Sequence, residues 1–199
     1  MSVVNNRTAW PLIGLCFALL FSLYSNVATS APLPDGQLET VVLFDPTNLE
    51  LPEGIAVDKV GNLFVTLAPL GQIRKIAPDG SESVFATLDP DINPPAVGAI
   101  GLAVDAPGNV FACLMSLNSN THGVWRISRD GYSRNRLPGT DQILFPNALA
   151  FDKVGNLYVT DLVMGAVWRI PPHGIAEVWV QDALLQGDGS LGLGFPLGA

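Results

Sequence analysis

Two oxygen-bearing side chains stand at matching points of the chain and can bind a metal ion. Asn147 follows Glu53 by 94 residues, twice the 47-residue spacing at which other residues recur. If the repeats surround a common axis, both side chains point toward it. Ca²⁺ accepts carboxylate and amide oxygens but needs about six to eight of them, so two are too few for tight binding. A solvated carboxylate at Glu53 and an Asn147 that holds its own turn are the competing interpretations.

Two further side chains can move a proton. Asp161 directly follows the apolar run 157–160, where a metal ligand, a general base and a turn cap are the three interpretations. His122 lies in the longest predicted inter-strand connection, 114–123. Long loops often carry function, and histidine titrates near neutral pH. His122 is therefore a candidate proton carrier, against the alternative of an ordinary solvated histidine.

Other site chemistries are excluded by what the sequence does not contain. It has no G-x-S-x-G, H-E-x-x-H, C-x-x-C or phosphate-loop motif. The two cysteines, Cys16 and Cys113, cannot form a disulfide scaffold. Cys113 lies in an apolar run, where a lone cysteine is usually just buried.

The composition indicates a globular β-rich chain. Of 199 residues, 48% are hydrophobic and 14% are charged, which excludes a disordered chain and a coiled coil. Eighteen acidic residues against ten basic ones give a net charge of −8, and all the acids follow residue 31. Such a chain is a poor partner for nucleic acid or anionic lipid.

The first thirty residues resemble a signal peptide. One base, Arg7, precedes the fourteen-residue apolar run 11–24, which is shorter than the ~20 residues that span a bilayer. Small residues follow, and cleavage after Ser30 fits the small-x-small rule. The sequence predicts export to the periplasm or the extracellular space, with no stable membrane insertion after cleavage. An uncleaved anchor is the alternative, and Cys16 lacks the small preceding residue of a lipidation site.

A 47-residue repeat organises the rest of the chain. Segments 51–66 (LPEGIAVDKVGNLFVT), 98–113 (GAIGLAVDAPGNVFAC) and 145–160 (FPNALAFDKVGNLYVT) align without gaps. In the shared D-x-x-G-N element the Asp can bond its own backbone and the Gly accepts positive φ, so it predicts a turn. Its recurrence in every unit indicates an architectural role for the aspartates Asp58, Asp105 and Asp152.

Each unit contains four short runs rich in Val, Ile, Phe, Tyr and Trp. Four antiparallel strands in 40–50 residues are typical of a β-propeller blade. Trp125 and Trp168 share one strand position and are expected to pack between blades, whereas Arg74, Arg126 and Arg169 are expected to pair with acids. A β-sandwich is the alternative fold, but it gives no reason for the regular spacing.

Counting strands predicts a partial six-bladed propeller in residues 31–199. Complete blades are expected at about 51–88, 98–140 and 145–182, with one N-terminal outer strand at 38–45. Residues 183–199 read as the start of an incomplete next blade, so we expect a truncated or partial chain. A dimer of two three-blade halves is the alternative. Open blade edges also predict self-association.

The phrases PEGIAVD (52–58), PNALAFD (146–152), GNLYVTD (155–161) and GQIRKIAPDG (71–80) resemble the senescence-marker-protein, gluconolactonase and luciferin-regenerating-enzyme family. NHL-repeat and strictosidine-synthase-like propellers share much of this pattern. The resemblance implies a divalent cation, calcium or zinc, that opens a lactone or sugar-acid ester. It implies Glu53 and Asn147 as ligands, while Gly98 and Ala99 stand where the family has another.

Two functions are therefore expected from the sequence. The first is an exported metal-dependent hydrolase acting on a small-molecule lactone or ester. The second is a non-catalytic NHL-type propeller that binds a partner through its rim. Because half a ring leaves the channel open, we expect the 199-residue chain itself to be inactive or very weakly active.

Overall fold

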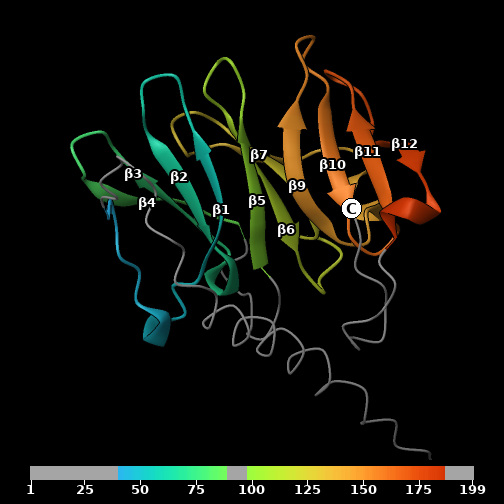
Figure 1. Ribbon diagram of the computed structural model, residues 1–199. Coiled ribbons are helices and arrows are strands. Elements are labelled where there is room, and N and C mark those ends of the chain that lie inside the picture. Colours follow the sequence, from blue (N-terminus) through green and yellow to red (C-terminus); the bar gives the residue numbers. More distant parts are fainter. Residues whose placement is uncertain (1–39, 89–97, 187–199) are drawn as a thin grey trace, which may run out of the picture. The chain divides into compact units, whose positions relative to one another are not determined.

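The described strands form three four-stranded antiparallel sheets (Figure 1). The computed structural model describes residues 40–88 and 98–186. The strands belong to one compact unit that begins at Phe44. The strand order within each sheet follows the sequence, so each sheet is a meander and forms one blade. The predicted all-β architecture with three four-stranded blades is confirmed.

Each of the three blades is built from four strands of three to seven residues. Blade 1 contains β1 (Pro52–Val57), β2 (Leu63–Leu67), β3 (Gln72–Ile76) and β4 (Glu82–Thr87). Blade 2 contains β5 (Gly98–Val104), β6 (Val110–Met115), β7 (Gly123–Ile127) and β8 (Arg134–Arg136). Blade 3 contains β9 (Pro146–Phe151), β10 (Leu157–Asp161), β11 (Ala166–Ile170) and β12 (Glu177–Gln181). Short 3-10 helices are η1 (Pro46–Asn48), η2 (Ala68–Leu70), η3 (Thr140–Gln142) and η4 (Ala183–Leu185).

The predicted outer strand at 38–45 is wrong over its described part. Residues 40–45 form no strand, and η1 begins at Pro46. The physical reason is pairing: a segment forms a strand only where a neighbour bonds its backbone, and none of the three described sheets takes this segment as a fifth strand. The predicted signal peptide at 1–30 and most of 183–199 lie outside the described residues. Within the described part, no helix has the length and apolar character needed to cross a membrane.

The three D-x-x-G-N turns have the predicted structure. The Asp58 carboxylate accepts hydrogen bonds from the backbone N–H of Asn62 at 2.9 Å and from its side-chain amide at 2.6 Å. Asp105 and Asp152 make the same pair of contacts four residues ahead. The turn glycines have φ between 88° and 94°. These aspartates therefore hold the connections between the first two strands of each blade.

The turns at Asp58 and Asp152 are expected to make the stability of the fold depend on pH in the acid range. The Asn156 amide is the main cause of the lowered pKa of Asp152. Burial alone would raise the pKa of Asp58, but hydrogen bonds from Asn62 and Val60 and the charge of Lys75 together lower it. A depressed folded-state pKa gives stability that is present above the usual value of 3.8 and is lost as pH falls below it.

We therefore expect the melting temperature to drop as the pH is lowered from about 5 to about 3. The Asp152→Asn variant should show a shallower drop than wild type in the same thermal scans. A melting temperature that stays constant over this range would contradict the role given to the turn carboxylates.

The core between blades 1 and 2 mixes residues of both. Phe64 and Ile73 of blade 1 pack in one buried cluster with Leu102 and Leu114 of blade 2, and Trp125 lies against it. Trp125 therefore packs between blades, as predicted. The corresponding Trp168 of blade 3 is buried as well.

The register corrects one sequence alignment. Trp125 pairs with Ala112 of the neighbouring strand, and Trp168 pairs with Val159. The residue of blade 1 at the position of Ala112 and Val159 is Val65, and it pairs with Arg74. Arg74 therefore occupies the tryptophan position and was wrongly grouped with Arg126 and Arg169. The mistake came from aligning residue types instead of counting back from the shared isoleucines Ile76, Ile127 and Ile170.

Candidate functional site

The innermost strand of each blade carries a β-bulge at the same place. In blade 1, Pro52 pairs with Leu67 and Ile55 with Val65, so residues 53 and 54 stand opposite Thr66 alone. The equivalent irregularities fall at residues 100–101 in β5 and 147–148 in β9. Bulges re-aim side chains and are frequent beside functional sites. Both predicted metal ligands, Glu53 and Asn147, thus lie on bulges.

Threonine hydroxyls hold two of these bulges. The Thr66 hydroxyl accepts a hydrogen bond from Gly54 N–H at 2.7 Å and donates one to the Ile100 carbonyl of blade 2 at 2.6 Å. In blade 3 the Thr160 hydroxyl accepts from Ala148 N–H at 3.0 Å. Cys113 stands at this position in blade 2 and is fully buried. The predicted burial of Cys113 is therefore confirmed.

Two bulge glycines allow the inner strands to approach one another closely. A Cβ on Gly54 would lie 2.2 Å from the Ile100 carbonyl oxygen, and a Cβ on Gly101 would lie 1.9 Å from the Asn147 carbonyl oxygen. In Figure 1, β5 lies between β1 and β9, as these contacts require. The backbone of Asn147 is thereby fixed against blade 2.

Glu53 has an unusual electrostatic environment. Its side chain reaches solvent, yet the protein packed around the carboxyl raises its pKa above the usual 4.5. Burial raises the pKa of the Cys113 thiol well above its usual value, and the negative charge of Glu53 adds to this effect. By contrast, every described aspartate whose pKa is clearly displaced has it lowered: Asp45, Asp58, Asp79, Asp130, Asp141 and Asp152.

The described residues do not by themselves fit a calcium or zinc centre. The bulge position held by Glu53 and Asn147 is Ile100 in blade 2, an apolar and buried side chain. Within residues 40–88 and 98–186, no three His, Cys, Asp or Glu side chains come close enough to hold a metal ion. The predicted ligand role of Glu53 and Asn147 stays a prediction, and no chemical step is assigned to a cation.

Asp161, one of the two predicted catalytic residues, is held by backbone. It has 0% exposed surface, and its carboxylate accepts N–H bonds from Leu144 at 2.8 Å and Phe145 at 3.2 Å. It also accepts at 3.1 Å from Val163 and from Met164. These four contacts correspond to the turn-cap interpretation of Asp161. The geometry supplies no contact that favours the catalytic role.

His122 is buried instead of solvated. The ring is 8% exposed; its Nδ1 accepts from Ser116 N–H at 3.2 Å, and its Nε2 donates to the Ile143 carbonyl at 2.6 Å. Both ring nitrogens are thus engaged by the backbone. His122 links the long loop of blade 2 to the segment before blade 3, and none of the hydrogen bonds described for it involves Glu53.

The 47-residue repeat itself indicates a structural role for Asp161. Counting 47 residues back from Asp161 gives Leu114 and then Leu67, and all three side chains are fully buried. A carboxylate in a column of buried leucines needs internal partners. This comparison predicts a capped structural aspartate.

A cavity of about 280 Å³ lies at the turn end of blades 1 and 2, away from the bulges. Its charged lining residues come from both blades: Asp58, Lys59, Lys75, Asp105 and Arg129. Neither Glu53 nor Asn147 lines it.

Comparison with known proteins finds similarity in structure. No protein-family model matches the sequence, and no curated protein matches it. A virginiamycin B lyase from Staphylococcus aureus is 20% identical with a TM-score of 0.52, over 70% of this chain and 45% of the other. The fold is a β-propeller. The chain spans about half the length of the solved propellers it matches.

Two other propellers extend the comparison. A gluconolactonase from Xanthomonas campestris is 20% identical, with a TM-score of 0.50 over 65% of this chain and 47% of the other. A propeller of a nidogen–laminin complex is 21% identical, with a TM-score of 0.54 over 68% and 50%. Gluconolactonases, which the sequence resembles, are thus among the propellers of similar structure.

Proposed function

We propose that this chain provides the Glu53-bearing blades of an exported propeller that hydrolyses a small-molecule lactone or sugar-acid ester. The observation that carries the proposal is the position of Glu53. It lies on the innermost strand, on a bulge outside the ladder, and its pKa is raised. Catalytic carboxyls commonly have raised pKa values, because a proton must be taken and returned near neutral pH.

The proposed chemistry uses Glu53 as general base. Its carboxylate takes a proton from water, and the oxygen of that water forms a bond to the lactone carbonyl carbon. The ring C–O bond then breaks, the alkoxide takes up the proton, and a hydroxy acid is released. Asn147, on the equivalent bulge of blade 3, can bind carbonyl or hydroxyl groups of the substrate through its amide.

Ligand binding and turnover are measured together, because among the described blades Glu53 is the carboxyl to which the proposed reaction is assigned. The chain is titrated with a panel of γ- and δ-lactones and their hydroxy acids by ligand-observed NMR, and proton release is followed in parallel. We expect at least one lactone to bind wild type and the matched control Glu177→Gln, and its proton release to slow at least tenfold with Glu53→Gln, whose amide keeps the side-chain shape but cannot take up the proton. No binding by wild type, or equal proton release by wild type and Glu53→Gln, would overturn the proposal.

Glu53→Gln should leave the stability of the fold intact. A carboxyl with a raised pKa is held less favourably as the anion, so removing its charge at pH 7 removes a cost. We expect a melting temperature equal to wild type or up to about 2 °C higher. A clear loss of stability would instead assign Glu53 a structural role.

A non-catalytic propeller that binds a partner is the second candidate. The observation in its favour is that Asp161 and His122 are both occupied by backbone groups. A propeller of similar structure was solved in a nidogen–laminin complex. The same titration separates the two functions, because a partner-binding propeller has no reason to prefer lactones through Glu53.

A further inference from the structure

We propose that the cavity between blades 1 and 2 binds a small hydroxy acid. Lys59, Lys75 and Arg129 bind its carboxylate, and the Asp105 carboxylate accepts a hydrogen bond from its hydroxyl group. The cavity volume of about 280 Å³ is close to the lower end of the range for ligand pockets, about 300 Å³. The cavity lies at the turn end of the blades, away from the bulge that carries Glu53, so the proposal does not depend on the proposed activity.

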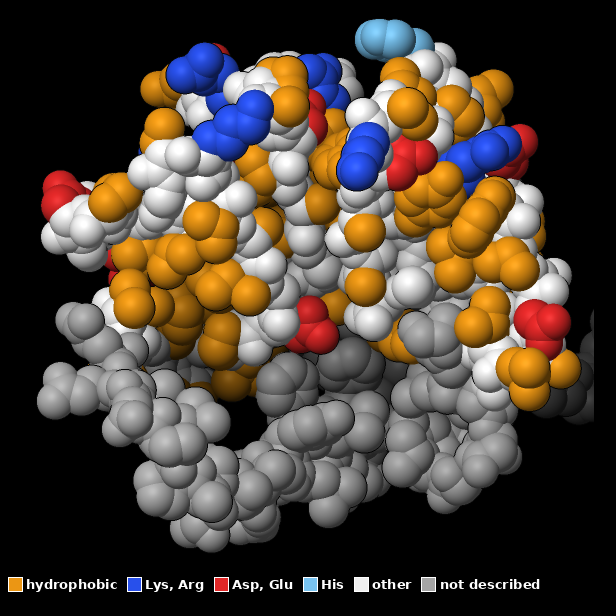
Figure 2. Space-filling model, turned by 45° about the horizontal axis from the view of Figure 1, so that its top comes forward, with side chains coloured by type: hydrophobic (Ala, Val, Ile, Leu, Met, Phe, Trp, Pro, Cys, Tyr) orange, Lys and Arg blue, Asp and Glu red, His pale blue; other side chains and the backbone are white. Residues whose placement is uncertain are grey.

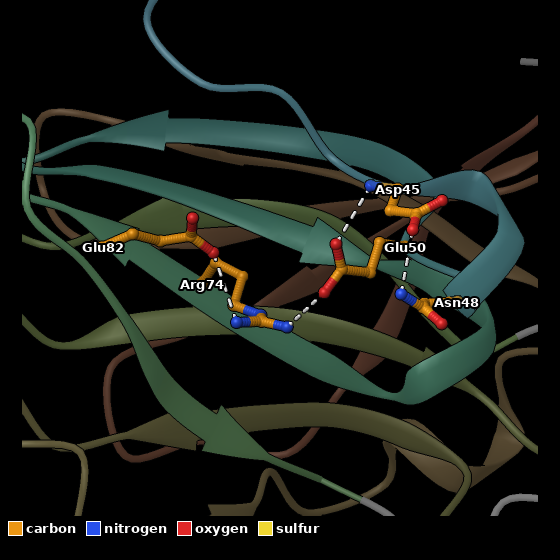
Figure 3. Close-up of polar contacts among 5 residues, drawn as sticks. All are labelled: Asp45, Asn48, Glu50, Arg74 and Glu82. Atoms are coloured by element: carbon orange, nitrogen blue, oxygen red, sulfur yellow. Dashed lines mark hydrogen bonds and ion pairs between the residues drawn. The ribbon is translucent and has the colours of Figure 1, made fainter.

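The bases of the cavity differ from the arginine that has a structural role in blade 1. The Arg74 guanidinium binds Glu50 at 2.7 Å and Glu82 at 3.2 Å (Figure 3). Glu50 also accepts a hydrogen bond from Asp45 N–H at 3.0 Å, which ties the segment before β1 to the blade. Within the described part of the chain, no ion pair involves any of the three bases of the cavity. Their charges are therefore left for an anion from outside the protein.

These three bases come together from two blades. Lys59 lies in the turn between β1 and β2, and Arg129 lies in the turn between β7 and β8. Lys75 pairs across the ladder with Phe64, so it shares the face of blade 1 that packs on blade 2. On the face drawn in Figure 2, Lys and Arg side chains gather at the upper end, where Figure 1 places the turn between β1 and β2. An anion bound between these turns would be reached from both sides.

The two carboxylates that line the cavity have different numbers of partners. Asp58 accepts three hydrogen bonds from within its turn. Among the described contacts Asp105 accepts two, both from Asn109, because Pro107 has no backbone N–H to supply the third. Asp105 therefore has acceptor capacity left for a hydroxyl group. Three cations against two carboxylates also leave one net positive charge in the lining, which matches a single carboxylate on the ligand.

Arg129 and Pro107 are departures from the 47-residue repeat. A Cβ on Gly108 would lie 3.7 Å from the Arg129 Cβ, whereas in the other two blades a proline ring stands beside the turn glycine, at 3.5 and 3.4 Å. Pro107 replaces a valine that both other blades have. Both departures occur in blade 2, and both residues line the same cavity. This coincidence indicates a role that belongs to this pair of blades and is not shared by every turn.

The experiment compares glycerate, propionate and glycerol, which have the same number of carbon atoms. Propionate lacks the hydroxyl groups of glycerate, and glycerol lacks its carboxylate. Each is titrated into the full chain at about 50 mM salt, which limits screening, and backbone amide shifts are followed by NMR. We expect glycerate to shift amides in residues 58–62 and 105–109 and to bind at least fivefold more tightly than the other two. Equal binding of the three molecules, no binding, or shifts confined to other residues would overturn the proposal.

Substitutions of the bases have matched controls in the repeat. Lys59→Gln, Lys75→Gln and Arg129→Gln should each weaken glycerate binding about tenfold, because each removes a charge-assisted hydrogen bond. Lys153 is the counterpart of Lys59 in an identical turn sequence, and Arg126 is the counterpart of Lys75; neither lines the cavity. Lys153→Gln and Arg126→Gln should therefore bind glycerate as wild type does. An equal loss in these controls would mean a general effect of net charge and would overturn the proposal.

Pro107→Val tests the hydroxyl contact without removing a charge. Valine stands at this position in both other blades, where its N–H donates to the turn aspartate at 3.0 Å, so the variant should fold normally. We expect its affinity for glycerate to fall at least threefold and its affinity for propionate to stay unchanged. Glu53→Gln should bind glycerate as wild type does, so a failure of the proposed function would leave this result intact. Unchanged glycerate binding by Pro107→Val, or its loss with Glu53→Gln, would overturn the proposal.

Discussion

Gly101→Ala is expected to lower the free energy of unfolding by about 3 kcal/mol or more. The new Cβ would lie 1.9 Å from the Asn147 carbonyl oxygen and 3.1 Å from the Ala148 Cα. Both obstacles are backbone atoms of the neighbouring blade, so no side-chain rotation relieves the overlap. Blades 2 and 3 must separate at the bulge, and their shared core opens with them.

The repeat offers a matched control for this substitution. Ala148 is the counterpart of Gly101 in blade 3 and is exposed. Ala148→Gly should therefore change stability by less than about 1 kcal/mol, through backbone entropy alone. Urea unfolding followed by circular dichroism measures both variants. Equal and small effects at the two positions would show that the inner strands do not depend on the glycine contact.

These glycines show where sequence reasoning succeeds and where it stops. The 47-residue period predicted the strands, the turns and the three blades, because each recurs in every unit and is local. The bulges were missed, since a two-against-one pairing follows from register between strands and leaves no composition signal. Yet Gly54 and Gly101 occupy the same position of the 47-residue repeat. A glycine that recurs at one repeat position indicates a place where the backbone of a neighbouring blade comes close.

The candidate site was less predictable than the fold. Glu53 and Asn147 were placed on equivalent strands correctly, but the position between them is a buried isoleucine, Ile100. Asp161 and His122 were proposed from residue type and loop length. Some of their backbone partners lie 16 to 21 residues away along the chain, and the sequence alone does not reveal such contacts. Residues that recur in every repeat are identified as structural from the sequence alone. Residues that occur in one repeat only, such as Asp161 and His122, need the three-dimensional structure before a role can be assigned.

Asp161→Leu is expected to be the most damaging substitution in blade 3. Leucine fits the volume, because Leu67 and Leu114 fill the equivalent positions and are fully buried. The loss is therefore purely polar: the N–H groups of residues 144, 145, 163 and 164 all lose the carboxylate. A hydrogen bond to a charged group contributes about 1.5–3 kcal/mol, and four such bonds are lost, so we expect a loss of about 4 kcal/mol or more.

Asp161→Asn tests the same explanation at constant shape. One carboxylate oxygen accepts from residues 145, 163 and 164, and the other accepts from Leu144 alone. The asparagine oxygen can keep the first three bonds while its NH₂ faces the Leu144 N–H, so we expect an intermediate loss of about 1–3 kcal/mol. Asp141→Asn, at an exposed carboxylate bonded to Gln142, is the control and should cost under about 1 kcal/mol. If Asp161→Leu were as stable as Asp161→Asn, side-chain volume and not the four N–H bonds would stabilise the segment before β9. A catalytic role for Asp161 would then need consideration again.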